Sequence, residues 1–159
     1  MIIERAEMSF LEIPFRMSVT HGARADRTFS DSLVLRLEAG GTSGYGEAVV
    51  RDYVSGSLGI GEDFRGQAVR AGARIVAALQ AAGPSWRDGL SALAAYPCSA
   101  SELPLLCAAE TAVLDLACRA EGADVYGVLG APPVRTSVAY GGSMPILSDE
   151  EAKSFIRLF

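Results

Sequence analysis

Apolar and polar side chains alternate with a period of two over much of the first fifty residues. The apolar members of the first two runs are Ala6, Met8 and Phe10, then Leu33, Leu35 and Leu37. Such alternation predicts strands that each bury one face. Turn residues then lead into a third strand at Ser43–Val50. We therefore predict a three-stranded antiparallel meander, with Pro14 helping to end the first strand and a polar, mobile loop at Arg16–Ser30.

From about Asp63 the apolar positions follow the period of a helix instead. We predict helices near residues 63–82, 85–95 and 101–121, with Ser85 as the N-cap of the second. The third helix is apolar nearly all round, which favours a position buried in the middle of the domain. The fold class is thus α+β, a meander followed by a helical bundle.

Two carboxylates interrupt the third helix. Asp115 precedes Arg119 by four residues and can pair with it, whereas Glu110 has no cation at helical spacing and is expected to reach another element. We interpret both carboxylates as structural, and a catalytic role is the alternative.

The end of the sequence predicts one more strand and one more helix. Residues 136–140 form an extended run, and Ser148 with Glu151 has the spacing of a capping box that opens a helix at 152–158. A lone strand–helix unit cannot bury a parallel strand, so the chain looks interrupted. The predicted domains are 1–130 and 131–159.

Composition and charge exclude several function classes. A net charge of −5 without a Lys/Arg-rich run argues against nucleic acid and anionic membrane surfaces as partners. No apolar run approaches the roughly 20 residues of a membrane span, and the first residues do not resemble a signal peptide, so we expect a cytoplasmic protein. Three cysteines without a Cys-x-x-Cys pair argue against a disulfide framework or a zinc site; those inside the third helix suit small apolar fillers.

Three short motifs carry a family resemblance: Gly44-Tyr45-Gly46-Glu47, the helical stretch Ala108–Leu116, and Tyr126–Gly130. In this order and at this separation they resemble the N-terminal capping domain of the mandelate racemase/muconate-lactonizing enzyme branch of the enolase superfamily. The resemblance implies an enolase-like N-terminal domain at 1–130, followed by the first strand and helix of an incomplete (β/α)8 barrel. A complete barrel needs roughly 250 residues, against 159 here.

The resemblance also implies a type of chemistry. Parent enzymes remove a proton next to a carboxylate, and a divalent metal, usually Mg²⁺, stabilises the resulting enediolate. The required acidic ligands and Lys-x-Lys base map to no residues of this sequence, in which Lys153 is the only lysine. We therefore assign no catalytic residue, no metal ligand and no cofactor to the chain itself and expect it to be inactive alone, which leaves its standing as an enzyme open.

Capping domains of this family close over the barrel mouth with two loops that exclude water and read the distal part of the substrate. In the first loop, His21 and Arg24 are candidates to pair with a substrate anion. In the second, at residues 51–56, Tyr53 is a candidate to pack against it. Ser143 matches the active-site rim by position. Solvated loop residues without such roles are the alternative.

The remaining motif residues, Gly44, Gly46 and Glu47, are expected to be structural: the glycines permit close backbone approach, and Glu47 braces the cap against its own loops or the barrel. The leading function is the capping, substrate-specificity domain of a Mg²⁺-dependent, muconate cycloisomerase-like isomerase or lyase that acts on a small carboxylate. The alternative is a free-standing, non-catalytic assembly or binding domain. Because an orphan strand and bare apolar surface recruit other chains, we also expect a homo-oligomer.

Overall fold

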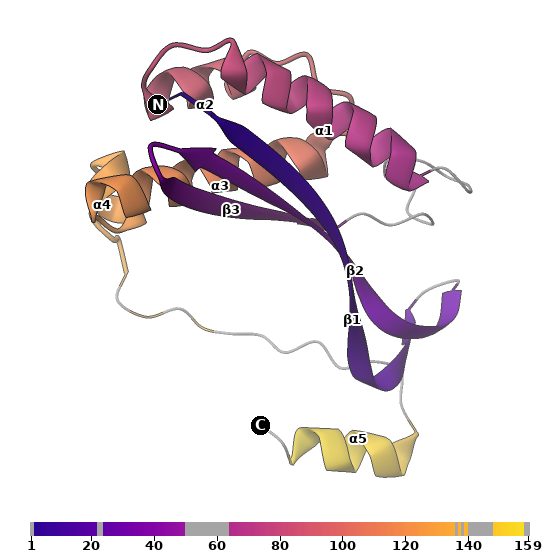
Figure 1. Ribbon diagram of the computed structural model, residues 1–159. Helices are drawn as coiled ribbons and strands as arrows, with labels where there is room; N and C mark the ends of the chain where they lie inside the picture. Colours follow the sequence, from indigo (N-terminus) through magenta and orange to yellow (C-terminus); the bar gives the residue numbers. More distant parts are fainter. Residues whose placement is uncertain are drawn as a thin grey trace. The chain divides into compact units, whose positions relative to one another are not determined.

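The computed structural model describes residues 2–21, 24–49, 64–135, 137, 139 and 148–157, with side chains left out at 17–21, 24–27, 31, 64 and 155. Its strands are β1 (Arg5–His21), β2 (Arg24–Ala39) and β3 (Thr42–Val49). Its helices are α1 (Phe64–Gln80), α2 (Trp86–Ala94), α3 (Leu103–Glu121), α4 (Val125–Leu129) and α5 (Asp149–Ile156) (Figure 1). The α+β class is confirmed. So are the three helices expected between residues 63 and 121, to within about two residues at each end.

The antiparallel sheet, as far as the described residues define it, has the strand order β1-β2-β3. β2 and β3 pair in a register that sets Leu35 opposite Gly46 and Arg36 opposite Tyr45. The turn between them uses Gly40 and Gly41, with φ of 56° and 74°. Backbone at these positive φ values favours glycine, which explains the Gly-Gly pair in the sequence.

The chain divides into two compact units. The first comprises Met1–Leu11 and Asp31–Pro132, and the second comprises Glu12–Ser30 and Pro133–Phe159. β1 and β2 each contribute residues to both units.

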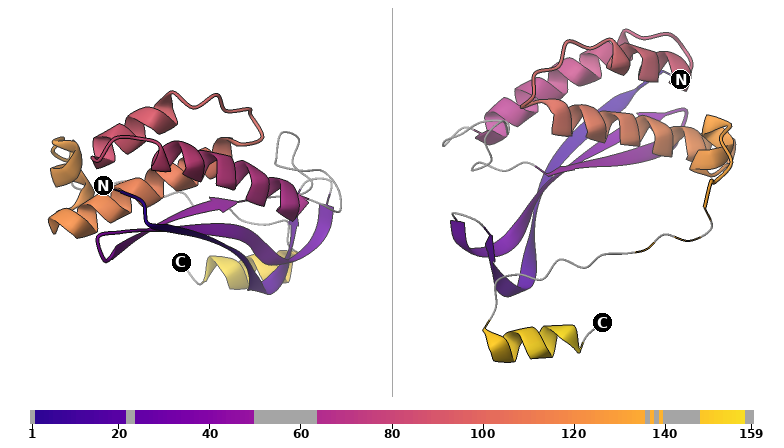
Figure 2. Two further views of the ribbon diagram at one scale, coloured as in Figure 1. Left: turned by 45° about the horizontal axis from the view of Figure 1, so that its top comes forward. Right: turned by 180° about the vertical axis from the view of Figure 1, so that it is seen from behind.

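The core of the first unit lies between the sheet and its helices. Figures 1 and 2 show α1, α2 and α3 on one face of this part of the sheet. Leu33 and Leu37 of β2 are fully buried, and Ile75 of α1, Leu93 of α2 and Val113 of α3 belong to the same apolar cluster. The period-two pattern of the sequence therefore identified the buried face of the sheet correctly.

The opposite face of the sheet is charged. The Arg36 guanidinium donates to Glu7 of β1 at 3.0 Å, pairs with Glu38 on its own strand, and donates to Ser43 of β3 at 3.2 Å. One arginine thus joins all three strands. Arg5 adds a further pair with Glu7. These charged side chains pair with one another, so this part of the sheet surface can stay in contact with water.

The predicted loop at Arg16–Ser30 is wrong. β1 continues through Pro14 to His21, and β2 already begins at Arg24. β1 is an edge strand, and a proline without an amide proton is tolerated at an edge where that position faces away from the ladder. Pro14 is exposed. The proline therefore did not end the strand, and the polar stretch is a long β-hairpin.

The position predicted for α3, buried in the middle of the domain, is only partly confirmed: the helix contacts β3, α1, α2 and α4, but one side of it is exposed. Its inward face is buried, but Leu103 is 53% exposed, and Cys107 and Thr111 on the outward side are exposed as well. Cys107 is a free thiol at the surface. The sequence pattern overestimated the burial because apolar side chains surround the helix, while the described part of the chain leaves its outward side exposed.

The helix ends carry the capping residues that the sequence indicates. Ser85 and Asp88 form a reciprocal capping box at α2, with bonds of 3.0 and 2.9 Å between side chains and amides. At α5 the Glu151 carboxylate accepts from the Ser148 amide at 3.0 Å. α4 was not predicted as a helix, although Asp124 caps it and Gly130, at φ 66°, ends it.

The extended run expected at residues 136–140 lies mostly outside the described residues, and neither Ser137 nor Ala139 is assigned to a strand. Within the described ranges no helix has the length and apolar character needed to cross a bilayer.

Candidate functional site

The most constrained contact in the fold joins β3 to α3 through two glycines. A Cβ placed on Gly46 would overlap the carbonyl oxygen of Ala108 and lie 2.9 Å from the amide nitrogen of Ala112. One placed on Gly44 would lie 2.5 Å from the Cβ of Leu116. Real Cβ atoms do not come this close, so strand and helix touch through their backbones. The Gly-x-Gly spacing therefore follows from alternation: both glycines face the helix.

Asp115 fastens the same junction from the helix side. The Tyr45 amide donates to Asp115 Oδ2 at 2.9 Å, and Arg119 Nε donates to the same oxygen at 2.9 Å. The Arg119 guanidinium also lies 5.7 Å from the centroid of the Tyr45 ring. The hydrogen bond and charge of Asp115 raise the pKa of Arg119. The Asp115–Arg119 pair expected from the i, i+4 spacing is confirmed. The additional bond from the Tyr45 amide to Asp115 was not predicted from the sequence.

Glu47 points to the other face of the sheet. Its carboxylate accepts from Ser32 Oγ at 2.6 Å, which links β3 to β2 beside the paired residues Ser32 and Val49. Ser32 is only 3% exposed, so its hydroxyl needs this partner. Within the described residues Glu47 thus holds its own sheet together.

Glu110 behaves differently from the other carboxylates. It is half-buried on α3, and among the described residues no hydrogen bond or ion pair reaches it. The contact with another element that the sequence led us to expect is not found in this part of the chain.

The candidate substrate residues are only partly placed. His21 ends β1 and Arg24 begins β2, so the hairpin brings their backbones to the same tip. Their side chains lie outside what the structure describes, as do Tyr53 and Ser143 entirely. The substrate roles of all four stay predictions.

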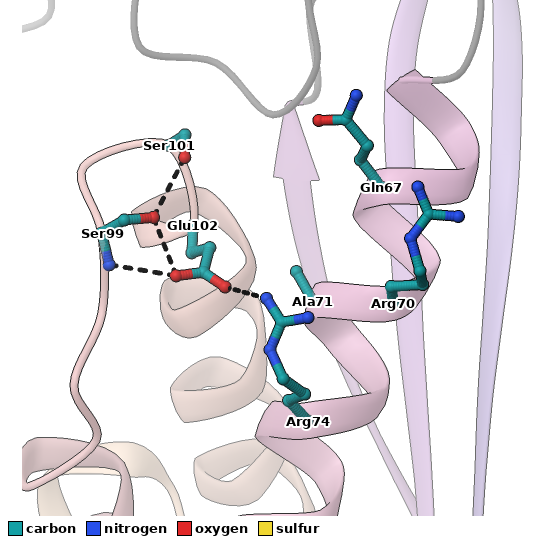
Figure 3. Close-up of a pocket in the computed structure, with 7 residues that line it drawn as sticks. All are labelled: Gln67, Arg70, Ala71, Arg74, Ser99, Ser101 and Glu102. Carbon is teal, nitrogen blue, oxygen red and sulfur yellow. Dashed lines mark hydrogen bonds and ion pairs between the residues drawn. The ribbon is translucent and has the colours of Figure 1, made fainter.

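A polar cavity of about 290 Å³, which sequence reasoning missed, lies between α1 and the segment before α3. Its lining is Gln67, Arg70, Ala71, Arg74, Ser99, Ser101 and Glu102 (Figure 3). In the figure the Arg74 side chain points from α1 toward the Glu102 carboxylate, while Ser99 approaches that carboxylate from the other side.

Glu102 organises this cavity wall. It is 8% exposed and accepts from the Ser99 amide at 3.0 Å, the Ser99 hydroxyl at 2.8 Å and Arg74 at 2.5 Å. The hydrogen bonds from Ser99, then that from Arg74, lower the pKa of Glu102. The Ser-x-Ser-Glu run before α3 was the available sequence signal. Because the Glu102 carboxylate already accepts hydrogen bonds from Ser99 and Arg74, we interpret the cluster as a structural contact that joins α1 to the start of α3.

The described residues contain no group of three or more His, Cys, Asp or Glu side chains that could hold a metal ion. Three of the carboxylates that they do contain bind backbone amides, hydroxyls or guanidinium groups, as described above for Glu47, Glu102 and Asp115.

The solved structures that resemble this fold include the following two. The first is an L-Ala-D/L-Glu epimerase, with a TM-score of 0.55 and 18% identity over 82% of this chain. The second is a mandelate racemase/muconate lactonizing protein from Herpetosiphon aurantiacus, with a TM-score of 0.58 and 18% identity over 76% of this chain. The chain shares their fold. The fold implied by the family resemblance is thereby confirmed. The chain spans about a third of either structure, 34% and 32%, and no protein-family model or curated protein matches its sequence.

The glycine contact predicts a sharp steric effect. Gly46→Ala should destabilise the fold by roughly 2 kcal/mol or more, because a methyl group cannot fit against the backbone of α3 without separating the two elements. Urea unfolding followed by circular dichroism measures it.

Gly72→Ala is the matched control. Its added methyl would meet only the flexible end of Met8, and alanine is the better helix former by about 1 kcal/mol. Equal losses in the two variants would contradict the backbone-contact account.

The lowered pKa of Glu102 predicts a pH effect of defined sign. Its stabilisation is present above the ordinary pKa of 4.5 and is lost as the pH falls through the lower pKa of the folded state. The stability difference between wild type and Glu102→Gln should therefore shrink as the solution is acidified below 4.5. Chemical unfolding over a pH series measures this difference. Arg74→Ala should have the smaller effect, because both Ser99 donors remain. A pH-independent difference for Glu102→Gln would refute the assignment.

Proposed function

We propose that the chain belongs to the mandelate racemase/muconate-lactonizing family and is the capping, substrate-specificity domain of a Mg²⁺-dependent isomerase or lyase. The observation that carries the proposal is the fold shared with an L-Ala-D/L-Glu epimerase over 82% of this chain. The glycine contact between β3 and α3 supports the proposal, because Gly44 and Gly46 of the family-like motif are the residues that allow the two backbones to touch.

In this proposal the tip of the β1–β2 hairpin is the part of the domain that contacts the substrate. His21 ends β1 and Arg24 begins β2, and at this position their side chains can pair with the distal carboxylate of a substrate and help to exclude water. A bound Mg²⁺ would supply charge stabilisation for proton abstraction next to a carboxylate. The described residues of this chain offer no ligand set for it, so the metal ligands and the base are assigned to a barrel domain.

The proposal can be tested by domain exchange. Residues 1–130 replace the matching N-terminal part of the L-Ala-D/L-Glu epimerase, and kcat/KM is measured over acidic and neutral dipeptides. Arg24→Ala in the chimera should lower kcat/KM for acidic dipeptides by roughly 10- to 100-fold, the value of one charge-assisted hydrogen bond, and change neutral ones little. Arg87→Ala on the exposed surface of α2 is the matched control.

Two outcomes would count against this function. One is a folded, active chimera whose dipeptide preference is that of the parent epimerase. The other is an equal loss for acidic and neutral dipeptides in Arg24→Ala, which would indicate a general structural effect and no contact with the distal carboxylate.

The chain by itself should show no epimerase or racemase turnover and no stoichiometric, micromolar Mg²⁺ binding, because positioning without a base and metal ligands does not abstract protons. Isothermal titration calorimetry with Mg²⁺ and a coupled epimerase assay check this. Turnover by the isolated chain would contradict the assignment of the base and the metal ligands to a barrel domain.

The exposed apolar side chains of the helices favour a second candidate, a free-standing assembly or binding domain. Leu103, Tyr126 and Leu129 are 53%, 48% and 52% exposed. A reading frame that continues through a Lys-x-Lys and three acidic ligands would decide for the enzyme cap.

Self-association through residues 131–159 also stays a prediction, which light scattering can test.

A further inference from the structure

The outer edge of β3 has backbone groups that do not pair with β2. The Tyr45 amide donates to Asp115, so the opposed residues Arg36 and Tyr45 form a pair without mutual hydrogen bonds. Such pairs alternate with hydrogen-bonded ones along an antiparallel ladder. Ser43, Tyr45, Glu47 and Val49 therefore direct their amides and carbonyls away from β2, toward the outer edge of the sheet.

Among the described residues, partners are found for only part of this edge. Asp115 takes up the Tyr45 amide, and Arg119 holds the carboxylate in place at 2.9 Å. For the outward amides of Glu47 and Val49, no backbone partner occurs among the described residues outside the ladder itself. The side chains of Tyr45 and Val49 are each 43% exposed, and both residue types favour strands.

We propose that the outer edge of β3 is a strand-accepting surface that Asp115 keeps closed, and that its occupant, once it is open, is β3 of a second copy of this chain. An added strand hydrogen-bonds to outward amides and carbonyls. Tyr45 lies between Ser43 and Glu47 in the outward set, so any pairing along most of β3 needs its amide. The single carboxylate of Asp115 removes that donor.

The strand itself favours a second copy as partner. Antiparallel self-pairing centred on Gly46 sets Tyr45 opposite Glu47 and Ser43 opposite Val49, and no like charges face each other. Centring on Glu47 would oppose two carboxylates and is disfavoured. The register around Gly46 uses all four outward residues, and it can form only when Asp115 releases Tyr45.

The experiment compares Asp115→Ala with Asp115→Asn in the full 159-residue chain. Amide hydrogen exchange at Tyr45 is measured in dilute solution, and molar mass by light scattering over a concentration series. Asp115→Ala should speed Tyr45 exchange by about tenfold or more and raise the mass above that of wild type at the same concentration. Asp115→Asn keeps a side-chain oxygen at the same position, and both readouts should stay close to wild type.

A second substitution locates the contact. Val49→Pro removes one outward amide without touching the Ser32–Glu47 bond, and proline is tolerated on an edge strand. In the Asp115→Ala background it should return the mass to that of wild type. If Asp115→Ala does not fold, Asp115→Ser replaces it, because its shorter side chain also fails to reach Tyr45.

Two results would overturn the proposal. The first is a folded Asp115→Ala or Asp115→Ser chain with protected Tyr45 exchange and the mass of wild type. The second is association that survives Val49→Pro, which would place the contact on another surface. Measuring wild type at every concentration separates this effect from association through residues 131–159.

Discussion

The backbone contact between β3 and α3 is the constraint on which the first unit depends. Gly44 and Gly46 leave no side chain between strand and helix, and Ala108, Ala109 and Ala112 on the facing side of α3 are fully buried. At this distance a single methyl group is too large, so the position of the helix over the sheet is defined by contact rather than by adaptable side chains. The leucines of β2 belong to the same buried apolar cluster as residues of α1 and α2.

The acidic side chains secure this arrangement by binding the backbone. Asp115 accepts from the Tyr45 amide, Glu102 from the Ser99 amide, and Asp88 from the Ser85 amide. Each joins a loop or strand to a helix, and two of them pair with an arginine as well. These three carboxylates therefore cap and brace the fold in the described part of the chain.

Much of this could be predicted from sequence, because the relevant physics is local. Alternating leucines identify a buried sheet face, and Ser85 with Asp88 identifies a helix start. The failures arose from tertiary context. Pro14 suggested a strand end only because its edge position was unknown, and the Tyr45–Asp115 bond joins residues separated by 70 positions. The candidate substrate residues could be named only through the family resemblance, since no local pattern specifies what a hairpin tip binds.

The glycine contact bears on what the Gly-Tyr-Gly-Glu motif can be used to infer. Both glycines are required by packing, and Glu47 binds Ser32 of the same sheet, so nothing in these interactions depends on turnover. Selection for a folded domain would keep the motif in an active enzyme, in a protein with a different substrate, and in a descendant that has lost its reaction. As a marker in genome searches, the motif therefore reports architecture and descent, and activity has to be established from residues elsewhere.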